Sequence, residues 1–300
     1  MAGTFTQVDL SQLPAPAVVE TLDFETILSD MLADLVARDP SFTALVESDP
    51  AFKVLEVAAY RELLVRQRVN DAARAVMVAF ATGADLDQIA ANYGVSRLLI
   101  TPADDSTIPP TPAVFEADAD LRARIVLSLE GYTSAGSQGS YVFHALSASG
   151  DVKDASAVSP DPGEVVVYVL SRTGNGAASV DLIAAVEAAL NDDRVRPLTD
   201  LVSVFSASIV NYTITAELVV YPGPDSAVVL QAAQAAAAAY ATAQHRMGYD
   251  VTLSGIFAAL HQPGVQRVVL TSPSVNIVVD DGEAAFCTAI NVTAATATDV

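Results

Sequence analysis

The sequence predicts an α+β fold, with a long N-terminal helical bundle region followed by two small α/β modules of the helix-helix-hairpin type. Three observations lead to this class. Residues 24–83 carry apolar side chains at helical spacing with few interruptions. A proline-rich stretch then ends this pattern just after residue 100. From residue 118 onward, short helical patterns alternate with β-branched runs that turn residues separate.

Two helices are expected to form most of the N-terminal region. The first covers residues 24–40, where apolar residues recur at spacings of three and four until Pro40. The second is expected to run without a break over residues 49–82. Asp49 is a suitable N-cap before a proline at the first helical position, and Gly83 is a suitable residue just beyond the C-terminus.

The second helix carries an apolar seam with alternating spacings of three and four, which is the heptad pattern of a helix that packs against another helix. The seam consists of Leu55, Ala58, Glu62, Val65, Val69, Ala72, Val76 and Ala79. Four of the chain's 15 Lys and Arg residues lie within residues 60–77 of this helix: Arg61, Arg66, Arg68 and Arg74.

Charges that flank a heptad seam select the partner and the register of a helical assembly. We therefore expect a subunit interface on this helix, with the candidate residues Arg61, Glu62, Val65, Arg66, Arg68, Val69, Ala72, Arg74 and Val76. The alternative is a solvated helix face on which Arg66 pairs with Glu62 one turn away.

The chain divides into four predicted regions. The helical region covers residues 1–100, and a proline-rich connector covers 101–117. The first α/β module is expected over 118–200. The second covers 201–300 and ends in an Ala/Thr-rich tail, which we expect to be disordered or docked on a neighbour.

The two modules contain a weak internal repeat. The segment "FHALSASGDVKDASAVSP" at 143–160 parallels "FAALHQPGVQRVVLTSP" at 257–273. Both read as helix, glycine, strand, Ser-Pro and a further strand. The repeat indicates either two related modules or two independent uses of the same helix-hairpin pattern.

The charge of the chain excludes some classes of partner. Fifteen basic residues against 36 acidic ones give a formal net charge of −21, which repels nucleic-acid phosphates and anionic lipid. We therefore expect neither a nucleic acid nor a membrane as partner. The Ala-rich segment 226–243 is too weakly apolar for a membrane span and is expected to form an amphipathic helix.

The sequence offers few groups for catalysis. The three histidines lie far apart and Cys287 has no nearby partner, so we expect no metal site, no cofactor and no catalytic residue. One alternative function is a cytoplasmic nucleotide-binding enzyme that uses the loop around Gly174 and Gly176, which follows a strand and opens a helix.

A second alternative function is a DNA-binding regulator. The segment 85–97 resembles the start of a helix-turn-helix, with Asp85 as the cap of a helix that Gly94 ends. A recognition helix is missing from the pattern, because "LLITPADD" follows and is β-prone and then broken by proline.

Several stretches closely resemble one known family. They include "DLSQLPAP", "LDFETIL", "LEVAAYRELLVRQRVNDAARAVMVAFATGADLDQIAANYGVSR", "FEADADLRARI", "GSYVFHALSASGDVKDASAV", "PGEVVVYVL" and "VRPLTD". Over residues 8 to 272 the chain resembles the baseplate assembly protein J family of contractile-tailed bacteriophages, and the block from Tyr60 to Arg97 is the most specific part. Contractile bacteriocins and other injection devices use similar proteins.

The resemblance implies a non-enzymatic structural protein of the baseplate wedge. It implies assembly with a second copy of itself, a second wedge protein of the protein I type, a sheath initiator-like wedge protein and the central hub or spike. It also implies synthesis in the cytoplasm of the bacterial host and a final location in the tail baseplate of the virion.

Overall fold

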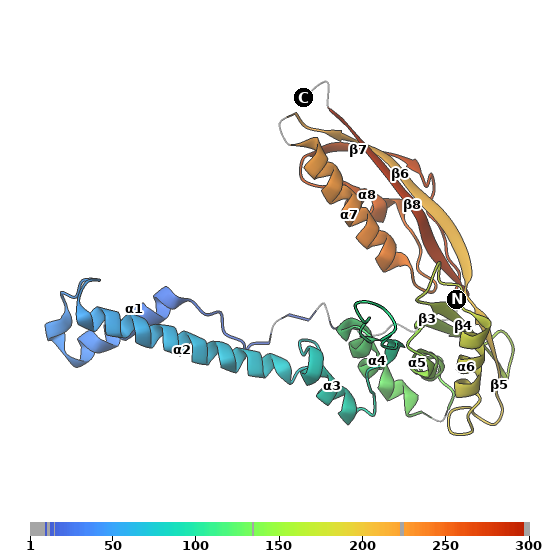
Figure 1. Ribbon diagram of the computed structural model, residues 1–300, viewed down its shortest axis with the longest axis horizontal. Coiled ribbons are helices and arrows are strands. Elements are labelled where there is room, and N and C mark those ends of the chain that lie inside the picture. Colours follow the sequence, from blue (N-terminus) through green and yellow to red (C-terminus); the bar gives the residue numbers. More distant parts are fainter. Residues whose placement is uncertain (1–9, 11–12, 15, 134, 223–224, 297–300) are drawn as a thin grey trace. The chain divides into compact units, whose positions relative to one another are not determined.

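The computed structural model describes residues 10, 13–14, 16–133, 135–222 and 225–296, and it confirms a fold of mixed helices and sheets (Figure 1). The chain divides into two compact units. Gln7–Ser96 and Asp118–Ala123 form the helical unit, and Arg97–Ala117 and Arg124–Val300 lie in the sheet unit.

The helical unit is built around two packed helices, α1 (Phe24–Arg38) and α2 (Pro50–Ala75). A short 3-10 helix, η2 (Pro40–Phe42), lies between them. Ile27 and Leu28 of α1 and Ala59 of α2 form the centre of a small apolar cluster. The predicted first helix and the predicted start of the second at Asp49-Pro50 are confirmed. A bundle that involves more helices than this pair stays a prediction.

The prediction of one continuous helix over residues 49–82 is wrong at its C-terminal end. Helix α2 stops at Ala75, and the chain turns before α3 (Gly83–Asn92) begins. The side chain of Arg122 explains the break, because its Nε donates to the Val78 carbonyl oxygen at 2.7 Å and its Nη2 to the Ala81 carbonyl oxygen at 2.8 Å. These contacts come from a residue more than 40 positions further along the chain and leave no local signal.

The caps of α3 differ in part from the prediction. The N-cap is Thr82, and Asp85 lies within the first turn of the helix instead of capping it. Gly83 has a positive φ of 53° and opens α3, so it follows a turn instead of ending a long helix. Gly94, with a φ of 68°, lies just beyond the C-cap Tyr93 as predicted.

The sheet unit begins with a two-stranded hairpin. Strands β1 (Leu99–Thr101) and β2 (Val114–Phe115) pair antiparallel, so the predicted extended connector folds back on itself. Helix α4 (Asp118–Gly131) follows, and its first six residues belong to the helical unit.

The first three-stranded sheet has the order β3-β4-β5, with β3 (Val152–Val158), β4 (Glu164–Ser171) and β5 (Leu201–Ser206). Strand β3 is antiparallel to β4, and β5 is parallel to it. Helices α5 (Gln138–Ala148) and α6 (Val180–Leu190) pack on the sheet. Because β5 pairs with β4, this sheet extends beyond residue 200, where we predicted the boundary between the modules.

The second three-stranded sheet has the order β7-β6-β8, with β6 (Ser208–Val220), β7 (Val265–Ser272) and β8 (Glu283–Thr296). Helices α7 (Ser226–Gln244) and α8 (Leu253–Leu260) cover it, as Figure 1 shows. The expectation of a disordered or docked tail is wrong for β8, which lies parallel to the whole length of β6; residues 297–300 lie outside the described residues.

The two sheets share one architecture with a different chain order. In both, a central strand lies between an antiparallel edge strand and a parallel edge strand. In the first sheet, the strand after Ser159-Pro160 is the central β4. In the second sheet, the strand that follows Ser272-Pro273 is the edge strand β8, because the central β6 precedes both helices. The two copies of the repeat therefore correspond over the helix and the first strand, but the strands that follow take different positions in their sheets.

The predicted amphipathic helix over residues 226–243 is confirmed by α7, whose Val229, Ala233, Ala237 and Ala241 are buried at intervals of four. Among the described residues, no helix combines the length and the apolar character that a membrane span requires.

Candidate subunit interface

Helix α2 has one face that packs within the chain and another that does not. The packed face holds Phe52, Leu55, Ala59 and Leu63, which contact the apolar residues of α1. Two turns further on, Asn70 is buried by the N-terminal segment. Its side-chain amide donates to the Glu20 carbonyl oxygen at 2.9 Å, and its side-chain oxygen accepts the Glu20 N–H at 3.0 Å.

The C-terminal half of the predicted seam lies on the uncovered face. Val65, Val69 and Val76 have exposed fractions of 63%, 57% and 74%, and Ala72 between them is also exposed. The spacings of four, three and four place these residues in one line along the helix and its C-cap. We call Val65, Val69, Ala72 and Val76 the α2 stripe.

More apolar side chains are exposed elsewhere on the same helix. Four further large apolar residues of α2 are exposed: Val54, Val57, Tyr60 and Leu64. A surface with this many exposed apolar side chains on one helix is typical of a binding face. The seam residue Ala79 does not belong to this surface, because it lies in the turn after α2.

Arg66 is paired within the chain. Its guanidinium contacts the carboxylate of Glu62 one turn earlier, and it lies 3.5 Å from the carboxylate of Glu20. The hydrogen bond to Glu62 is the main cause that raises the pKa of Arg66, and the charge of Glu20 adds to it. The alternative reading, in which Glu62 and Arg66 pair on one helix, therefore holds for these two residues.

The other three arginines of α2 are placed differently. In the described part of the chain, Arg61, Arg68 and Arg74 form no salt bridge. Arg61 and Arg68 each lie four residues before a member of the stripe, so they flank it at about 40° around the helix. Arg74 lies two residues after Ala72, about 200° around the helix, and therefore points away from the stripe.

The loop around Gly174 and Gly176 is closed by contacts within the chain. A Cβ at Gly176 would lie 2.5 Å from Leu170 Cδ1 and 2.9 Å from the ring of His245. At the start of α6, the Ser179 side chain accepts the Leu182 N–H at 3.2 Å. The glycine therefore allows close packing, and the helix N-terminus is occupied by its own cap.

The helix-turn-helix interpretation of residues 85–97 is wrong. After α3 and the turn at Gly94, the chain continues into strand β1. The helix that would enter a DNA groove is therefore replaced by a strand.

The three histidines occupy unrelated places. His144 lies within α5, and His245 and His261 are the C-cap residues of α7 and α8. Within the described ranges, no three His, Cys, Asp or Glu side chains are grouped closely enough to hold a metal ion.

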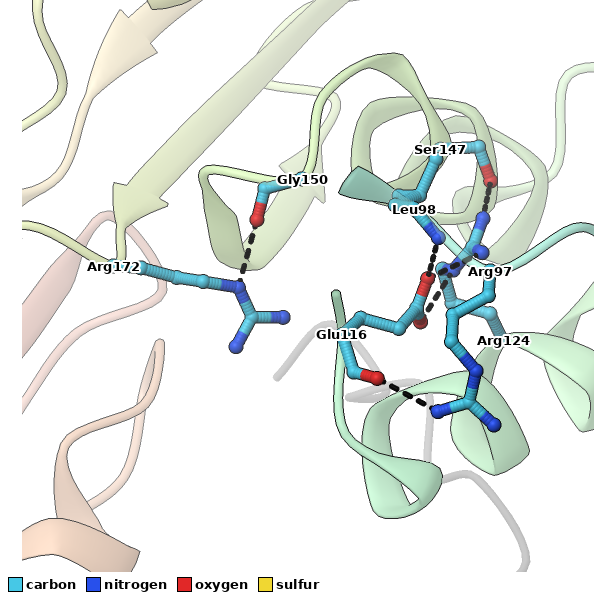
Figure 2. Close-up of polar contacts among 7 residues, drawn as sticks. All are labelled: Arg97, Leu98, Glu116, Arg124, Ser147, Gly150 and Arg172. Atoms are coloured by element: carbon cyan, nitrogen blue, oxygen red, sulfur yellow. Dashed lines mark hydrogen bonds and ion pairs between the residues drawn. The ribbon is translucent and has the colours of Figure 1, made fainter. Parts of the chain in front are cut away.

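One buried polar group was not anticipated from the sequence. Glu116, with Arg124, forms a salt bridge whose two side chains are 2% and 7% exposed. Figure 2 shows Arg97, Leu98 and Arg124 around Glu116. The residues are eight positions apart, beyond the spacing of an intrahelical pair, so the sequence alone gave no reason to join them.

An exposed apolar stripe with flanking cations is a candidate surface for assembly with another helix. Comparisons with known proteins give the particular class. The family models of the baseplate J-like N-terminal, central and C-terminal domains match residues 47–104, 133–206 and 212–293. Baseplate protein J of Escherichia phage P2 is 55% identical over 288 residues, which cover 94% of this chain and 95% of that protein.

The chain therefore belongs to the baseplate J-like family, and its role is that of a structural protein of a phage tail baseplate. The central-domain match ends at residue 206, where β5 also ends. The end of the matched central domain and the end of the last strand of the first sheet thus coincide.

Proposed function

We propose that the chain is a non-enzymatic subunit of the baseplate wedge of a contractile tail or a related injection device. It is made in the cytoplasm of the bacterial host and assembles with a second copy of itself, a second wedge protein, a sheath initiator-like protein and the central hub or spike. The observation that carries this proposal is the α2 stripe, because an exposed line of valines needs cover from another helix.

The chemistry of the stripe indicates how that cover is made. Val65, Val69 and Ala72 follow the heptad spacing, which matches the seam of a partner helix. The alanine at one of these positions allows close approach of the two backbones. Arg61 and Arg68 line the same face and favour a partner with acidic residues beside its own apolar seam.

The division of the chain supports separate tasks for its parts. The helical unit carries the stripe, and the sheet unit holds two helix-covered sheets. We propose that the helical unit joins the subunits of one wedge and that the α/β modules contact neighbouring wedges around the hub.

A location experiment tests this function directly. A tagged chain is produced in cells that lack the native copy, assembled tails are purified, and gold-labelled antibody against the tag is viewed by electron microscopy. The proposal requires label at the baseplate end of the tail. Tails that assemble fully without the chain, or label elsewhere on the tail, would overturn it.

A further inference from the structure

The hairpin of β1 and β2 extends into an arm. Leu99 pairs with Phe115, Thr101 with Val114, and Asp104 with Thr111 through two backbone hydrogen bonds of 2.9 Å. We call residues 99–115 the β1–β2 arm. Residues 101–112 of the arm are all exposed, so the chain covers little of it.

The base of the arm is fixed to the sheet unit by the buried salt bridge. The Glu116 carboxylate accepts the Leu98 N–H at 2.7 Å and receives Arg124 Nη2 at 2.7 Å and Nε at 3.1 Å (Figure 2). Arg97 donates to the Glu116 carbonyl oxygen at 2.7 Å. Residues 97, 98 and 116 are therefore held together immediately before and after the arm.

A second contact fixes the arm from the side. A Cβ at Gly150 would lie 2.2 Å from the Leu99 carbonyl oxygen, so the backbones touch at this point. The Gly150 carbonyl oxygen in turn accepts Arg172 Nε at 2.9 Å, as Figure 2 shows. The glycine permits an approach that a side chain would prevent.

The outer part of the arm is ordered by its own polar groups. The Asp104 carboxylate accepts the Ser106 N–H at 2.8 Å. The Thr107 hydroxyl accepts the Thr111 N–H at 3.1 Å and lies 3.0 Å from the Pro109 carbonyl oxygen. These bonds tie the two sides of the loop together, so its conformation is set before any partner arrives.

This ordered arm displays apolar side chains to solvent. Ile108 is 100% exposed and is followed by the exposed Pro109 and Pro110. Nearer the base, Leu99, Val114 and Phe115 are each about half exposed. An isolated exposed apolar residue is ordinary, but a fixed, internally bonded arm with an apolar tip has the preorganisation of a binding element.

We propose that the β1–β2 arm is a docking arm that inserts Ile108 and its two prolines into an apolar pocket on a different protein of the same assembly. Lys and Arg side chains line the rim of that pocket. This inference rests on the proposed function, because it assumes that the chain assembles with other baseplate proteins.

Charge selects the kind of partner. Asp104 and Asp105 lie on the arm beside its tip and are both exposed. The formal charge of −21 makes most of the surface of a second copy acidic, which repels them. The basic surface beside the α2 stripe of that copy is the one that the proposed function assigns to the helices of the wedge. A pocket with a basic rim on another protein attracts the two aspartates, so such a protein is favoured over a second copy as the partner of the arm.

Substitutions at the tip give the first test. Ile108→Asp should lower the yield of assembled tails about tenfold or more, as expected for a buried anchor at an interface. Ile108→Val should keep the yield. Leu198→Asp is the matched control, because Leu198 is also 100% exposed in the sheet unit and receives the same extra charge. The urea midpoints of all three variants should equal that of the parent chain.

An equal loss of yield with Leu198→Asp and Ile108→Asp would overturn the proposal, because added charge alone would then explain both. Unchanged yield with Ile108→Asp would overturn it as well. Asp105→Lys should also lower the yield, and Asp105→Asn should lower it less, since only the former repels a basic rim.

Photo-crosslinking identifies the partner. Benzoylphenylalanine replaces Ile108 in the full chain, purified tails are irradiated, and crosslinked peptides are sequenced by mass spectrometry. We expect a crosslink to a different protein, beside Lys or Arg residues. A crosslink to a second copy, or none from tails that contain the chain, overturns the docking arm alone. Complete tails from which the chain is absent overturn the proposed function too.

Discussion

Arg124 holds the buried carboxylate of Glu116 in a two-point contact, with Nε 3.1 Å from Oε1 and Nη2 2.7 Å from Oε2. Further hydrogen bonds join this pair to the Leu98 N–H and the Ser147 hydroxyl oxygen. Both charges are therefore removed from water and satisfied by the fold. The pair joins the start of the arm, its end and helix α4.

Removal of Arg124 should destabilise the sheet unit. Arg124→Met leaves the Glu116 charge buried without its partner, which costs about 3–5 kcal/mol. Glu116→Gln combined with Arg124→Met should recover part of this loss, because the amide oxygen still accepts the Leu98 N–H and no charge is buried. Urea unfolding followed by circular dichroism measures both variants. A double variant less stable than Arg124→Met would contradict the proposed cause.

His245 should make the stability of the sheet unit sensitive to pH. Burial lowers its pKa, with a further decrease from Lys153, although the contact of Nδ1 with the Ala285 carbonyl oxygen at 2.7 Å raises it. A folded-state pKa below the unfolded value of about 6.5 means that neutral His245 favours the fold above that pH. This contribution is lost as the pH falls through the folded-state pKa.

The measurement is a comparison with His245→Asn, whose side-chain amide can still donate to the Ala285 carbonyl oxygen. Urea midpoints are recorded between about pH 7.5 and pH 5. The midpoint of the parent chain should fall more steeply than that of the variant. Parallel curves would show that the fold does not lower the pKa of His245.

Gly176 and Gly174 form a natural pair for a test of close packing. Both have positive φ, 99° and 61°, but only Gly176 lacks space, since nothing lies within 4 Å of a Cβ at Gly174. Gly174→Ala should therefore cost about 1 kcal/mol for the left-handed backbone alone. Gly176→Ala should cost about 3 kcal/mol or more, because Leu170 and His245 must also move. Equal urea midpoints for the two variants would contradict the packing role.

The sequence predicted the elements that local patterns control. The helix start at Asp49-Pro50, the glycine after α3 and the buried face of α7 depend on residues within one or two turns. The end of α2 could not be predicted in this way. It depends on Arg122, which binds the carbonyl oxygens of Val78 and Ala81 from more than 40 positions away.

Only part of the candidate interface could be predicted from the sequence. The line of Val65, Val69 and Ala72 follows from spacing alone, and the structure places it on the surface. The pairing of Arg66 with Glu20 was not predicted, because it requires the N-terminal segment to lie along α2. The arm was missed since its anchoring bonds join residues 98, 116 and 124 by tertiary contact.

The charges beside the α2 stripe should matter for assembly and not for folding. Arg61→Glu combined with Arg68→Glu should lower the yield of assembled tails about tenfold, because both lie beside the stripe and lack salt bridges in the described chain. Arg74→Glu, about 200° around the helix from Ala72, is the control and should keep the yield. If Arg74→Glu lowers the yield as much as the double variant does, the total charge of the helix and not its position beside the stripe determines the yield.

The most direct measurement concerns Val69, at the middle of the α2 stripe. Val69→Asp changes a side chain that is 57% exposed, so the thermal midpoint of the free chain should stay within about 2 °C of the parent value. A charge within a helix-helix seam should nevertheless reduce incorporation of the chain into purified tails by about tenfold or more. Val228→Asp, on a 63% exposed position of α7, measures the effect of the same change elsewhere. If Val69→Asp chains are folded and enter tails as well as the parent chain does, the α2 stripe is not an assembly surface.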